Sequence, residues 1–87
     1  MAKRQLADTE LARWLRAEID DRPGWGIRTL AREMNPQEPE IARRALNRYM
    51  YEGSDPSDAY RDRIAEALDV DPSEVPTNVG PFLGTAA

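Results

Sequence analysis

Hydrophobic residues recur every three or four positions through most of this chain, which is the spacing of one face of a helix. Clusters of proline, glycine, asparagine and aspartate interrupt the pattern. No stretch alternates apolar and polar residues with a period of two, as a half-buried strand would. The pattern therefore predicts an all-α fold, a compact bundle of about five short helices with an irregular C-terminal tail.

Residues that cap or break helices mark the ends of the predicted elements. Asp8 or Thr9 can cap the first helix, and Ser57 can cap the fourth. The segment 71–74, DPSE, has the form of a capping box with proline at the first helical position, which predicts one further helical turn. The apolar stripes expected to be buried are Leu11, Trp14, Leu15 and Ile19 on the first helix and Tyr60, Ile64, Ala65 and Leu68 on the fourth.

Residues 27–53 predict two helices joined by a proline-bounded turn. Asn35-Pro36 should end the first of them, because proline cannot continue a helix and disfavours helical backbone in the residue before it. Pro39 suits the first turn of the next helix, expected over about residues 39–52. The residues expected to be buried are Ile27, Leu30, Ala31 and Met34 on the first helix, and Ile41, Ala45 and Tyr49, with Leu46 and Met50 beside them, on the second.

The charge is distributed unevenly along the chain. The net charge is −4, but residues 1–51 carry ten basic and eight acidic side chains, whereas residues 52–87 carry two basic and eight acidic ones. A positive contact face can coexist with an acidic remainder, which would suit nucleic-acid binding. The other interpretation is that the arginines only keep a solvated helix face soluble.

The arginine-rich second helix supplies the candidate DNA contacts. Arginine can bond guanine at two points and asparagine can read adenine in the major groove of DNA. The predicted base-contacting residues are Gln37, Arg43, Arg44, Asn47 and Arg48. The predicted phosphate-contacting residues are Lys3, Arg4, Arg28, Thr29, Arg32 and Tyr51. Ordinary surface charge is the alternative interpretation of the phosphate set.

Composition disfavours several other functions. The chain has no cysteine nucleophile and no histidine base, and it lacks these usual zinc ligands, so we expect neither an enzyme nor a cofactor or metal. In 87 residues there is little room for a small-molecule pocket. No apolar run approaches a membrane span of about 20 residues, and the N-terminus lacks the apolar segment of a signal peptide. A cytoplasmic protein without a membrane partner is therefore expected.

The domain is expected to cover residues 1–77, and residues 78–87 form an uncharged tail. That tail is either frayed or an arm that packs Val79, Phe82 and Leu83 against the domain or a second subunit. We expect double-stranded DNA as the partner, bound by a weak homodimer, because a single small domain binds DNA weakly. The alternative is a small helical protein–protein interaction module that uses the acidic C-terminal half.

Short motifs follow one another in a recognisable order. They are Leu11-Ala12, the segment 30–34 (LAREM), Ile41 as a buried aliphatic residue, the segment 52–57 (EGSDPS) and the segment 64–72 (IAEALDVDP). Over about residues 9–76 they resemble the Cro and lambda-repressor class of helix-turn-helix regulators, and the arginine-rich helix is similar to small regulators of actinobacterial phages and their hosts. The segment 35–39, NPQEP, departs from that class, which often has a small residue in the turn. The resemblance implies a small Cro-like transcriptional regulator or repressor that reads the major groove with residues 39–52.

Overall fold

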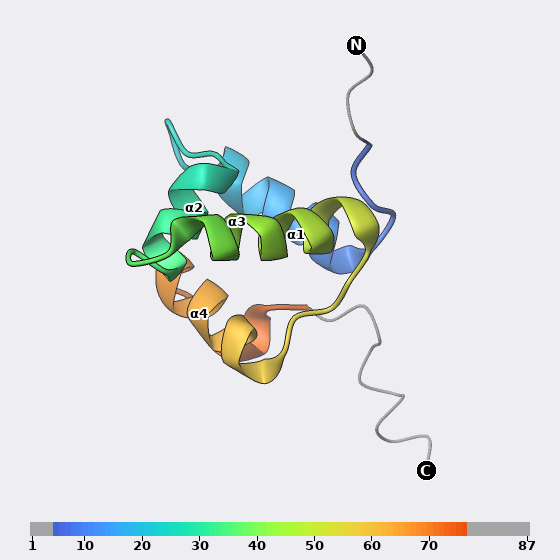
Figure 1. Cartoon of the computed structure of the whole chain (residues 1–87). Helices are drawn as coiled ribbons and strands as arrows, with labels where there is room; N and C mark the ends of the chain where they lie inside the picture. The colour runs from blue at the N-terminus through green and yellow to red at the C-terminus, as the bar shows by residue number, and fades with distance from the viewer. Residues whose placement is uncertain (1–4, 77–87) are drawn as a thin grey trace.

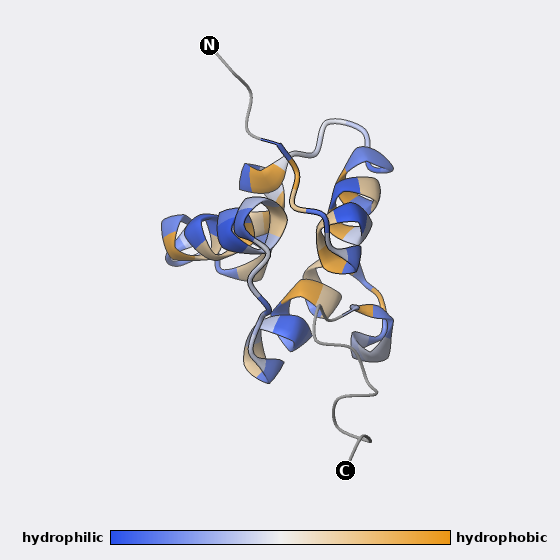
Figure 2. Cartoon of the chain, turned by 90° about the vertical axis from the view of Figure 1, so that its right-hand side faces the viewer, coloured by the Kyte–Doolittle hydropathy of each residue, from blue (hydrophilic) through white to orange (hydrophobic). Residues whose placement is uncertain are grey.

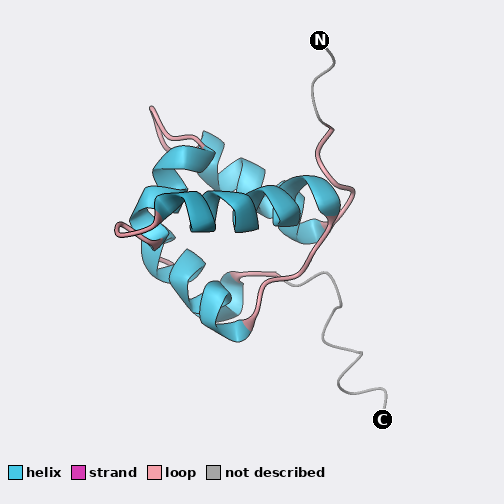
Figure 3. Cartoon of the chain, viewed as in Figure 1, coloured by secondary structure: helices cyan, strands magenta, loops and turns pink. Residues whose placement is uncertain are grey.

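A computed structural model of the chain describes residues 5–76, and within this range every regular element is helical (Figure 3). The elements in chain order are α1 (Glu10–Asp20), α2 (Ile27–Met34), α3 (Pro39–Asn47), the π-helical turn η1 (Arg48–Glu52), α4 (Asp58–Leu68) and the 3-10 turn η2 (Pro72–Glu74) (Figure 1). The all-α prediction is confirmed, with four α-helices in the described part rather than about five. The single further turn that the capping box predicted is η2, which ends because Val75 is extended before Pro76.

Side-chain caps begin the helices where the sequence predicted them. Thr9 Oγ1 accepts a hydrogen bond from the Ala12 N–H at 3.1 Å, so Thr9 rather than Asp8 caps α1. Ser57 Oγ accepts from the Tyr60 N–H at 3.3 Å at the start of α4. The capping box at η2 is also present. These helix starts are therefore determined by local sequence.

The turn between α2 and α3 is built by two residues that each precede a proline. Asn35 and Glu38 have ψ angles of 81° and 68°, outside the helical region, as a following proline favours. Asn35 Oδ1 also accepts a hydrogen bond from the Glu38 N–H at 3.1 Å. The predicted break at Asn35-Pro36 and the restart at Pro39 are both confirmed.

Helix α3 continues directly into η1, so the two together cover residues 39–52, the range predicted for the second helix. Gly53 ends this segment with a left-handed backbone, φ 78°, which glycine adopts without steric cost. The Ala7 N–H donates to the Met50 carbonyl at 2.7 Å, which holds the N-terminal segment beside η1 (Figure 1). Lys3, Arg4 and the tail at 78–87 lie outside the described residues.

All four α-helices contribute to one hydrophobic core, and Figure 2 shows hydrophobic segments in orange along each of them. Its largest fully buried side chains are Leu11, Leu15, Ile19, Leu30, Leu46, Met50, Ile64, Leu68 and Val75. Helix α2 packs against both α3 and α4, and α1 packs against η1. Trp14, Ile27 and Tyr60, which were predicted within apolar stripes, are only partly buried at the edge of this core. The predicted stripes thus meet in a single core.

The prediction that Ile41 of α3 is buried is wrong. The side chain was expected in the core but is 47% exposed. Ala42 is buried in its place, beside Ala45, Leu46, Tyr49 and Met50, which are buried as predicted, and the five form a continuous helix face. Small alanines on this face allow α3 to pack close to its neighbour, and the resulting register leaves Ile41 outside.

Candidate nucleic-acid interface

The arginines of α1 and of the loop after it have acidic partners. Arg13 lies 2.7 Å from Asp8, Arg16 lies 3.0 Å from Asp20, and Arg22 lies 3.1 Å from Glu18. The guanidinium of Arg22 also donates to the Leu68 carbonyl at 2.7 Å, which joins the end of α1 to the end of α4. These cations are therefore engaged within the fold.

The arginines of α2 and of the segment from α3 to η1 are arranged differently. Arg28, Arg32, Arg44 and Arg48 are all exposed, and none forms a salt bridge with another residue of the described part of the chain. Two like charges four residues apart destabilise a helix by about 0.2–0.5 kcal/mol. Each of these helical segments carries such a pair, at 28 and 32 and at 44 and 48. The described surface thus keeps these four cations without an acidic partner, at a small cost to stability.

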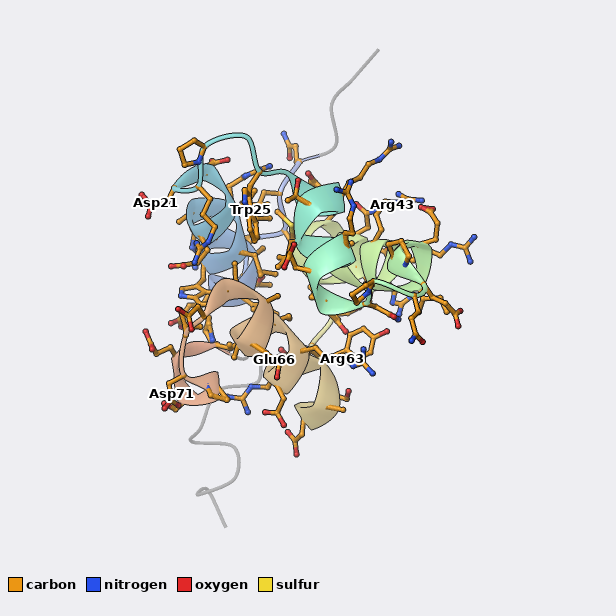
Figure 4. All side chains as sticks on the ribbon, turned by 90° about the vertical axis from the view of Figure 1, so that its left-hand side faces the viewer. Asp21, Trp25, Arg43, Arg63, Glu66 and Asp71 are labelled. Atoms are coloured by element: carbon orange, nitrogen blue, oxygen red, sulfur yellow. The ribbon has the colours of Figure 1, made fainter. Side chains whose placement is uncertain are left out.

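Arg43 and Arg44 are adjacent in sequence but have different roles in the structure. Arg43 forms a two-point ion pair within α3, with Nε 2.6 Å from Glu40 Oε1 and Nη2 3.0 Å from Glu40 Oε2. Arg44 is exposed and lies on the side of the helix opposite the buried face. Figure 4 shows Arg43 projecting from the edge of the molecule formed by α2 and α3. Of the two, Arg44 is the cation available to an external ligand.

The pKa of Glu40 is lowered by the arginines around the start of α3. The hydrogen bond from Arg43 holds the pKa of Glu40 below its ordinary value, and the charges of Arg43, Arg44 and Arg28 lower the pKa further. The same hydrogen bond raises the pKa of Arg43. Because Arg28 belongs to α2, cations from both helices act on one carboxylate. The fold therefore brings Arg28 of α2, and Arg43 and Arg44 of α3, within electrostatic range of one carboxylate.

The remaining predicted contact residues differ in how far they are exposed to solvent. Gln37 is exposed in the turn, and Asn47 and Tyr51 are half-buried. Thr29 Oγ1 accepts a hydrogen bond from the Gly26 N–H at 3.2 Å, so this hydroxyl stabilises the start of α2. Arg44 and Arg48 are four residues apart, and so are Asn47 and Tyr51, which places the four residues on one side of the helical segment.

Two features of α3 were not predicted as parts of this site. Glu40 is not among the predicted contact residues, yet it forms an ion pair with Arg43. The spacing of three residues between them was the available signal. Ile41 was assigned to the core, although the interval of three residues to Arg44 could have placed it on the charged side. Full burial of an isoleucine side chain stabilises a fold by about 1.5–3 kcal/mol, and the exposed Ile41 does not supply much of that stabilisation.

The acidic residues of the C-terminal half lie on a different part of the surface. Asp58, Asp62, Glu66 and Asp69 are exposed on or just after α4. In Figure 4 the labelled Glu66 and Asp71 are well separated from Arg43. The acidic residues of the C-terminal half are therefore separated from the arginines of α3 in space as well as in sequence.

The helices among residues 5–76 are all too short or too polar to cross a lipid bilayer. Comparison of the chain with models of protein families, with curated proteins and with solved structures finds no match.

Proposed function

We propose that this chain binds double-stranded DNA in a sequence-specific manner and acts as a small Cro-like transcriptional regulator. In this proposal α2, the turn at 35–38 and α3 form a helix-turn-helix, and α3 with η1 enters the major groove. The observation that carries the proposal is the set of four exposed arginines on α2, α3 and η1 that form no salt bridge within residues 5–76. An anionic polymer would neutralise these cations and release the counterions that surround its phosphates.

The exposed side of α3 determines which residues are assigned to base reading. Arg44 and Arg48 are unpaired on that side, and Asn47 lies between them in sequence. We assign them to base edges, because arginine and asparagine both offer paired hydrogen bonds in the major groove. Gln37 stands at the entry of the helix. Arg43 needs release from Glu40 before it can bind a base or a phosphate.

Phosphate contacts are assigned to α2. Arg28 and Arg32 are exposed one helical turn apart, and they precede the proposed reading helix as a positioning helix would. Because one small domain binds DNA weakly, we also propose a weak homodimer on a palindromic site with half-sites about one helical turn apart.

The proposal is tested by selecting ligands from a library of random duplexes and measuring affinity at two salt concentrations. The Arg44→Ala/Arg48→Ala variant should lose sequence preference, at about 1–3 kcal/mol for each base-reading arginine. The Arg28→Ala/Arg32→Ala variant should weaken binding to every duplex and reduce the salt slope by about one unit for each arginine.

The Arg13→Ala/Arg16→Ala variant is the matched control, because it removes the same charge from residues that are ion-paired on α1. It should retain the sequence preference of the parent. If folded protein shows no affinity for any duplex at low salt, the proposal fails, and protein binding through the acidic half becomes the function to test.

A further inference from the structure

Ile41 is the one large hydrophobic residue that is exposed among the described residues, with 47% of its surface accessible. It stands in the first turn of α3, two residues after Pro39. The neighbouring Ala42 is buried instead, so the register of the helix holds Ile41 at the surface. Its exposure therefore follows from the packing of α3 and does not come from a frayed end.

The surroundings of Ile41 restrict what could cover it. Arg44 and Arg48 follow it at intervals of three and seven residues, which places all three on one side of the helix. A ligand that covers this side must present an apolar group beside negative charge and hydrogen-bond acceptors. The major groove of DNA has this combination, because the thymine C5-methyl group is the apolar group on its base edges and phosphates border it.

We propose that Ile41 is a specificity-determining residue that contacts the methyl group of a thymine in the bound DNA. This inference rests on the proposed function. Three residues of helix rise by about 4.5 Å, close to the 3.4 Å spacing of bases along a strand. The thymine therefore lies within about one or two base pairs of the base that Arg44 reads.

Deoxyuridine provides a direct test, because it keeps the hydrogen-bonding edge of thymine and lacks only the methyl group. After the preferred duplex has been selected, each thymine is replaced in turn by deoxyuridine and the affinity is measured. One replacement should weaken binding of the parent protein about fourfold, the value expected for one buried methyl-sized group. The Ile41→Ala variant should bind the two duplexes equally, and Ile41→Val should keep part of the difference.

Folding and assembly are measured on the same samples. Ile41→Ala should keep the melting temperature of the parent within a few degrees, because the side chain lies outside the core. If the parent binds DNA through Arg44 but no single deoxyuridine weakens it, or if Ile41→Ala keeps the full difference, the thymine contact is overturned and DNA binding stands.

Two other outcomes would also overturn it. If Ile41→Ala turns a dimer into a monomer in sedimentation and keeps the preference for thymine, Ile41 is a contact between two copies of the chain. If the folded parent binds no duplex, the proposed function fails and the thymine contact fails with it.

Discussion

Arg63 on α4 donates a hydrogen bond to the carbonyl of Met34, the last residue of α2, with Nη1 and the oxygen 3.2 Å apart. The carbonyls of a final helical turn have no partner within the helix, so this bond satisfies one of them. The Arg63 guanidinium also lies 6.0 Å from the centre of the Tyr60 ring. Because α2 ends where the turn to α3 begins, α4 helps to set the position of that turn.

The Arg63→Met variant should therefore be less stable than the parent. Loss of the hydrogen bond should lower the free energy of unfolding by about 1 kcal/mol. In a chain of this size, that change lowers the melting temperature by about 4–8 °C in a thermal melt. Arg32→Met is the control, because Arg32 is exposed and unpaired among the described residues. Equal melting temperatures for the two variants would show that the bond contributes nothing.

The Glu40→Gln variant should bind DNA of arbitrary sequence more tightly than the parent. Removal of the carboxylate charge releases Arg43 for a phosphate, so the salt slope should steepen by up to about 0.9 units. The control is Glu33→Gln, which makes the same change of charge at an exposed position of α2. If both variants shift affinity and slope equally, overall charge rather than release of Arg43 is the cause.

The pH dependence of the Glu40–Arg43 pair follows from the lowered pKa of Glu40. A carboxyl whose pKa is lower in the folded state stabilises the fold above its ordinary value of 4.5, and this contribution is lost as the pH falls through the lowered value. The pair should therefore stay ionised at neutral pH. DNA binding by the parent and by Glu40→Gln should show parallel pH profiles between about pH 6 and pH 8.

Neutralising the acidic surface of α4 should raise affinity for arbitrary DNA sequences. These carboxylates lie away from Arg43 and repel phosphates at long range, an effect that is strongest at low salt. The variant carries Asp58→Asn, Asp62→Asn, Glu66→Gln and Asp69→Asn. Its preference among sequences should change little, because the proposed reading residues are intact. Unchanged affinity for a random duplex at low salt would contradict this electrostatic role.

Tyr49 should ionise only at strongly alkaline pH. Burial raises the pKa of Tyr49 to about 12, and the nearby Tyr60 contributes to the increase. Because the pKa is raised in the fold, this stabilisation is complete below the ordinary value of 10.0 and is lost as the pH rises through about 12. A phenolate absorbance titration of the parent should show a step near pH 12 that Tyr49→Phe lacks. Loss of that step in Tyr51→Phe instead would contradict the assignment.

The sequence by itself determined where the described helices begin and end. Thr9, Ser57 and Asp71 cap their helices through hydrogen bonds that span two or three residues, and Asn35-Pro36 ends α2 through local sterics. Such interactions depend only on neighbouring residues, so they can be read from the order of amino acids. The helical spacing of apolar residues likewise identified most of the core, because burial of one helix face requires that spacing.

Only the tertiary structure decided which side of α3 faces inward. The helix offers two overlapping apolar stripes, one through Ile41 and one through Ala42, and the spacing of residues does not rank them. Packing against neighbouring helices selected the stripe with the small Ala42, and that choice exposed Ile41 and left Arg44 on the outer side. Bonds such as Arg63 to Met34 join helices across 29 positions of sequence, so they exist only once the helices have assembled.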